Sequence, residues 1–348
     1  MVRFPRFRPT ILTVMLLATV SLLSACSSRL NTFEARSDSA KQILDLYVLV
    51  IIVSSVVGAA VLLAMLWLMI KYRARPGGVA KQIHGNTKLE VTWTIAPILL
   101  ILTIAIPTMF WIAGTAEDPD DDALQVTAIG HQWWFEFQYP GLGPDGGDLV
   151  TANELHVPIG RDIVVTLESD DVIHSFWVPK LVGKTDMIPG RINTLETFKP
   201  TDIGVFYGQC AEFCGSAHAL MQFRVHVDSQ GDFDRWTAGF SAGPKASEAG
   251  TPAARGEVLF ATCAACHSIQ GTTAAGAIGP DLTLFGERTT VGAGILDNTD
   301  ENLRAWIKDV RALKPIPKEG LFMPTFADAL SDDDIAAIAA YLNNQTLD

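Results

Sequence analysis

The chain has 348 residues, of which 49% are hydrophobic and 18% are charged, and its formal net charge is −12. This length allows two or three domains, and the composition is too apolar for an ordinary soluble protein, so we expect part of the chain to lie in lipid. The acidic balance excludes a nucleic-acid-binding protein, which would need clustered Lys and Arg, and it favours a basic redox protein as a visiting partner.

The N-terminal segment, residues 1–25, has the features of an export signal. Three arginines precede the apolar run ILTVMLLATVSLL, and small residues follow it before Cys26. The stretch LSAC resembles the lipobox of bacterial lipoproteins, which implies that Cys26 is acylated as the first residue of the mature chain. The alternative is an uncleaved membrane anchor in which the cysteine is incidental.

Two further apolar runs predict a transmembrane hairpin within residues 26–115. The spans cover about residues 43–70 and 91–114, and each is longer than the ~20 residues needed to cross a bilayer. The loop between them is basic, whereas the acidic stretch AEDPDDD follows the second span, so we expect the loop in the cytoplasm and the later domains outside. Glu90, at the cytoplasmic end of the second span, is either a functional ionisable group or a first-turn acid favoured by the helix dipole.

Residues 116–235 consist of short segments with alternating apolar residues, separated by Gly, Pro and Asp, which predict an all-β sandwich or barrel. Within them, YGQCAEFCGSAHALMQF places Cys210, Cys214 and His218 at four-residue spacing, with Met221 three residues further on. Thiolate and thioether donors select copper, and imidazole suits copper as well. The alternatives are a disulfide between the two cysteines, which does not call for the histidine and methionine, and a zinc site, which has little use for a thioether.

A copper site needs a further ligand from elsewhere in this domain. The stretch DVIHSFWVP offers His174, just after the predicted strand IVVTLES. The competing histidines, His131, His156 and His226, lie inside strand-like segments, where a single histidine is more often packed or on the surface than a ligand. His174 is therefore the first candidate for this ligand, with the other three histidines as alternatives.

Residues 236–252 are rich in Gly, Ala, Ser and Pro without periodicity, and predict a linker before a final domain, residues 253–348.

The final domain contains CAACH, a motif typical of covalent c-type haem attachment, in which Cys263 and Cys266 bond the vinyl groups and His267 binds iron. A thioredoxin-like pair would need a surrounding βαβ pattern, and a zinc site would need a second Cys/His pair downstream. The one methionine after Thr251, Met323, is the candidate for the second axial ligand. Flanking helical segments predict an all-α domain.

Several stretches together resemble the subunit II signatures of haem–copper cytochrome oxidases: HQWWFEFQY, DVIHSFWVPKLVGKTDMIPGRIN and YGQCAEFCGSAHALM. GPDLTLFG resembles class I cytochromes c, and the order signal, hairpin, cupredoxin, linker and cytochrome c resembles the caa type of subunit II over nearly the whole chain. The resemblance implies a dinuclear copper centre with bridging thiolates, terminal imidazoles, a weak thioether ligand and a backbone carbonyl. By position these are Cys210 and Cys214, His174 and His218, Met221, and Glu212. The Glu212 side chain would also reach a magnesium ion at the interface with subunit I.

The same resemblance implies the function. An external donor, such as a cytochrome c or a cytochrome bc complex, would reduce the haem, which would reduce the copper pair. Subunit I, with subunit III as a further partner, would reduce oxygen to water and pump protons across a bacterial plasma membrane, with this multi-pass subunit's copper and haem domains on the outer side. Glu90 falls at the cytoplasmic mouth of a proton path. Trp133, more than Trp134, is the candidate electron relay, the alternative being ordinary aromatic core.

Other functions compete with this hypothesis. A copper-containing nitric oxide reductase could have a similar electron-accepting subunit, and a copper-delivery or redox-sensing lipoprotein could carry metal without feeding a catalytic partner. A quinol oxidase subunit is disfavoured, because copper ligands and haem would serve no purpose there. Gas uptake and co-purification with a large haem-containing subunit distinguish these classes.

Overall fold

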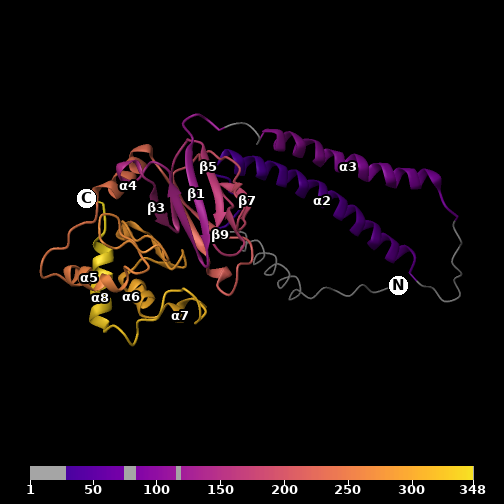
Figure 1. Cartoon of the computed structure of the whole chain (residues 1–348). Helices are drawn as coiled ribbons and strands as arrows, with labels where there is room; N and C mark the ends of the chain where they lie inside the picture. Colours follow the sequence, from indigo (N-terminus) through magenta and orange to yellow (C-terminus); the bar gives the residue numbers. More distant parts are fainter. Residues whose placement is uncertain (1–28, 74–83, 115–118, 348) are drawn as a thin grey trace, which may run out of the picture.

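The computed structural model describes residues 29–73, 84–114 and 119–347, so the expected signal segment and Cys26 lie outside the described residues. In chain order the described parts form a helical hairpin, a β-sandwich and a helical domain, with the sandwich between the other two (Figure 1). The fold class expected from the sequence, a two-helix hairpin with a cupredoxin-like sandwich and an all-α domain, is confirmed.

Helices α2 (Asp38–Lys71) and α3 (Thr87–Gly114) form the hairpin and run side by side (Figure 1). Their most apolar windows have mean hydropathies of 2.8 and 2.3, and both helices are long enough to cross a membrane. Apolar side chains remain exposed along them, as lipid contact requires. Pro97 and Pro107 leave α3 continuous. Each helix begins before the span expected from hydropathy, because polar residues form its first turn.

The first turn of α2 is embedded in the sandwich rather than joined to it by a loose segment. Ser37 caps the helix and is buried, and the carboxylate of Asp38 accepts a hydrogen bond from the Lys199 amide at 2.8 Å. Ser39 donates to the carboxylate of Glu196 at 2.8 Å. Burial raises the pKa of Glu196. The membrane hairpin and the outer domain therefore share one continuous, hydrogen-bonded junction.

The sandwich consists of two five-stranded sheets. The first has the order β3-β2-β1-β5-β8, with bounds Leu149–Ala152, Trp134–Tyr139, Leu124–His131, Ile163–Ser169 and Asn193–Thr194. The second has the order β4-β10-β9-β6-β7, with bounds Glu154–Pro158, Gln222–Asp228, Gly204–Cys210, His174–Val178 and Val182–Met187. Alternate residues of β1, β2 and β9 are buried, so the period-two pattern of the sequence turns one face of each strand to the core.

Four phenylalanines fill the core between the sheets. The rings of Phe135 and Phe176 both lie 4.7 Å, centroid to centroid, from the ring of Phe223. Phe137 completes the cluster at 5.8 Å from the same ring. A Cβ at Gly208 of β9 would lie only 2.2 Å from the Phe223 ring, so glycine lets β9 approach this core closely. The close packing fixes the position of the end of β9, where the cysteine-rich loop begins.

The linker expected over residues 236–252 starts later in the structure, because its first part is helical. Residues 236–242 belong to helix α4 (Gln230–Ala242), capped by Ser229, whose side chain accepts a hydrogen bond from the Asp232 amide. Phe233, Trp236 and Phe240 are buried on one face of the helix. The helix was missed because glycine and alanine lie between its apolar anchors and obscure the helical period.

The helical domain contains α5 (Pro252–Leu259), α6 (Asp300–Lys308), α7 (Val310–Leu313) and α8 (Asp332–Asn344), with a small β11–β12 hairpin, Thr290–Val291 and Leu296–Asp297. Helices α5 and α8 cross closely at Gly256, where a Cβ would lie 1.9 Å from the carbonyl oxygen of Ala337. Ser331 and Asp334 form a capping box at the start of α8. The crossing holds the segment after α5, which carries the CAACH motif, against the C-terminal helix.

Candidate metal centre and haem-binding motif

The cysteine-rich loop begins where β9 ends and closes where β10 begins. Cys210 is the last residue of β9, and its amide donates to the carbonyl of Met221 at 2.9 Å. This hydrogen bond closes the intervening residues into a compact loop, in which Cys210, Cys214 and Met221 are buried. His218 begins the short 3-10 helix η2 (His218–Leu220) within the same loop.

His174 reaches this loop from the neighbouring strand. It is the first residue of β6, and β6 pairs with β9 so that Phe176 lies opposite Cys210. Nδ1 of His174 consequently lies 3.9 Å from Sγ of Cys210, and the His174 side chain is fully buried. The strand pairing explains how a histidine far away in sequence joins the loop.

The remaining donors surround the two sulfurs. The sulfurs of Cys210 and Cys214 are 3.7 Å apart, so the two cysteines are free rather than bonded to each other. Nδ1 of His218 and Sδ of Met221 lie 3.6 and 3.8 Å from the sulfur of Cys214, and the carbonyl oxygen of Glu212 lies 3.1 Å from the sulfur of Cys210. All six groups singled out in the sequence thus meet at one place, and this set of soft and borderline donors fits copper.

The pKa values of the two thiols are shifted in opposite directions. Contact with the Cys214 thiol lowers the pKa of Cys210 to about 3, despite the opposing effect of burial. The same contact and burial raise the pKa of Cys214. The pair alone therefore favours a single negative charge. A bound cation would favour loss of the second proton as well, because metals bind the thiolate form.

Asp171 orients His174, a role that sequence reasoning missed. Its carboxylate accepts a hydrogen bond from Nε2 of His174 at 2.8 Å, which leaves Nδ1 free to face the sulfurs. Although burial lowers the pKa of His174, this hydrogen bond raises it overall. Asp171 also accepts from the Gln132 amide at 2.6 Å. The sequence offered one signal for this role, which is that Asp171 lies three residues before the candidate ligand His174.

The competing histidines lie apart from the sulfurs. The ring of His131 stacks on Trp134 at 4.2 Å, and the ring of His156 stacks on His226 at 4.4 Å. Trp133, in contrast, is buried beside the loop, and its Nε1 donates to the carbonyl of Cys214 at 3.0 Å. Of the two tryptophans, Trp133 is the one that contacts the candidate metal centre.

The CAACH motif follows α5 in a tight turn. The amide of Cys266 donates to the carbonyl of Cys263 at 3.0 Å. Nδ1 of His267 lies 2.8 Å from the carbonyl oxygen of Pro280, an arrangement that directs Nε2 outward. A Cβ at Gly279 would lie 2.7 Å from the His267 ring, so glycine provides the close approach that this ring orientation needs. Burial lowers the pKa of His267, which favours the neutral imidazole that binds iron. The residues fit a covalently attached haem.

Three other candidate residues lie on more exposed segments. Met323 is half-buried in the irregular segment between α7 and α8. Glu212 is half-buried, and its Oε1 accepts a hydrogen bond from the amide of Phe213 at 3.2 Å. Glu90 is exposed in the first turn of α3.

Comparisons with known proteins cover all three parts of the chain. Residues 25–110 match the family described as cytochrome C oxidase subunit II, transmembrane domain, residues 144–228 match its periplasmic domain, and residues 253–346 match cytochrome c. The cytochrome c oxidase subunit 2 of Alkalihalophilus pseudofirmus is 38% identical over 92% of this chain and 93% of the relative. The chain belongs to the cytochrome c oxidase subunit 2 family.

Two further known proteins are similar to this chain. The subunit 2 of Bacillus subtilis is 34% identical over 94% of this chain and 96% of the relative. The crystal structure of the periplasmic domain of subunit II of cytochrome oxidase from Bradyrhizobium japonicum is 33% identical and covers 35% of this chain and 94% of that chain, with a TM-score of 0.32.

Membership of the cytochrome c oxidase subunit 2 family establishes the coarse function. The chain is a membrane-anchored subunit of a haem–copper oxidase, with subunit I as its partner and its periplasmic domain on the outer side. The periplasmic domain implies copper, and the cytochrome c domain implies haem.

Proposed function

We propose that this subunit accepts electrons from an external donor at a covalent haem c, passes them to a dinuclear copper centre and delivers them to subunit I, where oxygen is reduced to water with proton pumping. The observation that carries the proposal is the convergence of two unbonded sulfurs with imidazole, thioether and carbonyl donors. A domain with a haem-attachment motif follows in the same chain. Each site alone is compatible with other functions, but together they form a relay.

The residues have distinct roles in this proposal. Cys210, Cys214, His174 and His218, together with Met221 and the Glu212 carbonyl, would hold the two copper ions, the cysteines through their thiolates and the histidines through Nδ1. When bound, such a pair shares one electron over both ions, so bond lengths change little and transfer is fast. Cys263 and Cys266 would attach the haem, and His267 and Met323 would bind its iron. Trp133 relays electrons towards Cys214.

Further roles concern the membrane and the partner subunits. The Glu212 carboxylate reaches a magnesium ion at the interface with subunit I, and Glu90 marks the cytoplasmic mouth of a proton path. Cys26 carries a lipid at the outer face of a bacterial plasma membrane, which the two helices of the subunit span. Subunit III is a further partner, and the donor is a cytochrome c or a cytochrome bc complex.

An optical and electron paramagnetic resonance spectrum of the purified membrane complex, with metal analysis, tests the proposal. We expect covalent haem bands that survive acid-acetone extraction, a mixed-valence copper signal, and two copper ions assigned to this subunit. Zinc or no metal in the loop would contradict it. Oxygen and nitric oxide uptake by the same sample separates an oxidase from a nitric oxide reductase.

A further inference from the structure

The sandwich and the helical domain meet through a buried carboxylate at the start of β4. Oε1 of Glu154 accepts hydrogen bonds from the amides and hydroxyls of Thr289 and Thr290, at 2.8 to 2.9 Å. The other oxygen lies 3.1 Å from Nε2 of His226. Only 2% of Glu154 is exposed. A carboxylate this buried is stabilised by its partners, and most of these come from the other domain.

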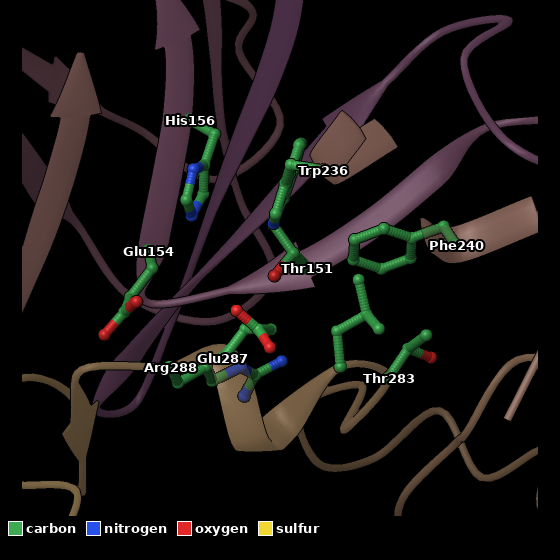
Figure 2. Close-up of a pocket in the computed structure, with 9 residues that line it drawn as sticks. Thr151, Glu154, His156, Trp236, Phe240, Thr283, Glu287 and Arg288 are labelled. Atoms are coloured by element: carbon green, nitrogen blue, oxygen red, sulfur yellow. The ribbon is translucent and has the colours of Figure 1, made fainter. Parts of the chain in front are cut away.

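Figure 2 shows Glu154 at the edge of a small cavity that is lined by residues of both domains. Glu154 and His156 from the sandwich, with Trp236 of α4, face the segment that carries Glu287 and Arg288. The cavity walls therefore come from both domains.

A second buried ionisable group, Lys314, also forms a hydrogen bond across this interface. Nζ of Lys314, in the segment after α7, donates to the backbone carbonyl of Trp133 at 2.7 Å. Lys314 is 4% exposed, and burial lowers its pKa to about 7. Arg224 of β10 adds a hydrogen bond to the carbonyl of Gly294 at 2.7 Å. Buried polar groups whose hydrogen bonds are completed across the boundary distinguish this contact from a transient encounter surface.

The docked arrangement brings an aromatic ring of the helical domain onto Trp133. The ring of Phe322 stacks on Trp133 with centroids 5.4 Å apart and planes inclined by 17°. Phe322 immediately precedes Met323, the candidate haem ligand, and Trp133 donates to the carbonyl of Cys214. A continuous series of contacts thus leads from a candidate haem ligand to a candidate copper ligand.

We propose that Glu154 and Lys314 are positioning residues that dock the haem domain on the sandwich, so that Phe322 delivers electrons to Trp133 within one chain. This inference rests on the proposed function and assigns the contact through which that function operates. The step moves one electron from the haem iron, which is oxidised from ferrous to ferric, to the copper pair, which is reduced by one electron. No bond or proton is exchanged.

The test uses the complete oxidase and two measurements. Hydrogen exchange at residues 289–294 and 314–322 reports docking without reference to activity, and rapid reduction of the haem followed by optical detection at the copper band reports transfer. Glu154→Gln and Lys314→Met each remove a hydrogen bond that involves a buried charged group. We expect amide exchange at the interface to be about 10- to 100-fold faster in each, with slower copper reduction. Exposed Glu257 and Lys318 supply the matched controls, Glu257→Gln and Lys318→Met.

The Phe322→Leu variant distinguishes electron transfer through the Phe322 ring from docking of the haem domain on the sandwich. We expect unchanged amide protection but slower copper reduction in this variant, and recovery of the rate in Phe322→Tyr. The inference is overturned if the wild type transfers electrons while the Glu154, Lys314 and Phe322 variants match it in both measurements. Absence of copper reduction in the wild type, with haem present, would instead overturn the proposed function itself. Haem and copper content, measured spectroscopically in each variant, identifies any variant that fails to assemble.

Discussion

Replacing Asp171 with asparagine is expected to weaken copper binding without removing any proposed ligand. One oxygen of Asp171 accepts from Nε2 of His174 at 2.8 Å and from the Val172 amide at 2.6 Å, and the other accepts from the Gln132 amide at 2.6 Å. An asparagine has only one acceptor oxygen, so it must present an NH₂ group to at least one of these donors. Loss of such a supporting hydrogen bond lowers metal affinity by about 10- to 100-fold, which corresponds to about 1.4 to 2.7 kcal/mol.

The measurement is a copper titration of the purified complex against a competing chelator, followed by the paramagnetic signal of the copper pair. Asp170→Asn is the matched control, because Asp170 is the preceding residue and its side chain is 71% exposed. The reasoning is refuted if Asp171→Asn and Asp170→Asn bind copper equally well. An unchanged haem spectrum in both variants would show that any loss is local to the sandwich.

Three further predictions concern the interface and the haem domain. Burial raises the pKa of Glu154, but the contact with His226 and hydrogen bonds from Thr289 and Thr290 lower it overall to about 2 from its usual 4.5. The ionised carboxylate should therefore contribute about 3 kcal/mol above pH 4.5, lost as the pH falls towards 2. Protection of the interface amides, relative to the exchange of an unfolded peptide at each pH, should fall with it, and constant protection over this range would contradict the assignment. Gly256→Ala should destabilise the haem domain by about 1 to 3 kcal/mol in thermal unfolding, whereas Gly231→Ala, where a Cβ meets nothing within 4 Å, should not. Met323→Leu should keep the covalent haem but lower its reduction potential in a redox titration, and an unchanged potential would exclude Met323 as the axial ligand.

The sequence predicted local features of the site better than contacts between distant segments. Cys210, Cys214, His218 and Met221 could be recognised because they share one short loop with regular spacing. His174 needed the resemblance to a known family, since the pairing of β6 with β9 that brings it to the loop is a tertiary contact. The fold class followed from hydropathy and period-two alternation.

Features that depend on docking could not be predicted. Glu154 has the sequence context of an ordinary strand residue, and its hydrogen-bond donors lie on the haem domain, more than a hundred residues away. The contact between Phe322 and Trp133 is equally remote in sequence. The linker was expected to start too early, because α4 is stabilised by burying Trp236 and Phe240 rather than by strong helix-forming residues.

The embedded first turn of α2 couples the orientation of this helix to that of the sandwich. Because Asp38 and Ser39 are hydrogen-bonded to the sandwich, rotation of the membrane helix must turn the outer domain with it. One residue inserted in α2 beyond this turn would rotate the lipid-facing side by about 100° and raise the sandwich by about 1.5 Å. The number of residues in α2 therefore sets the height of the copper loop above the bilayer. It also sets which side of the sandwich faces the catalytic subunit.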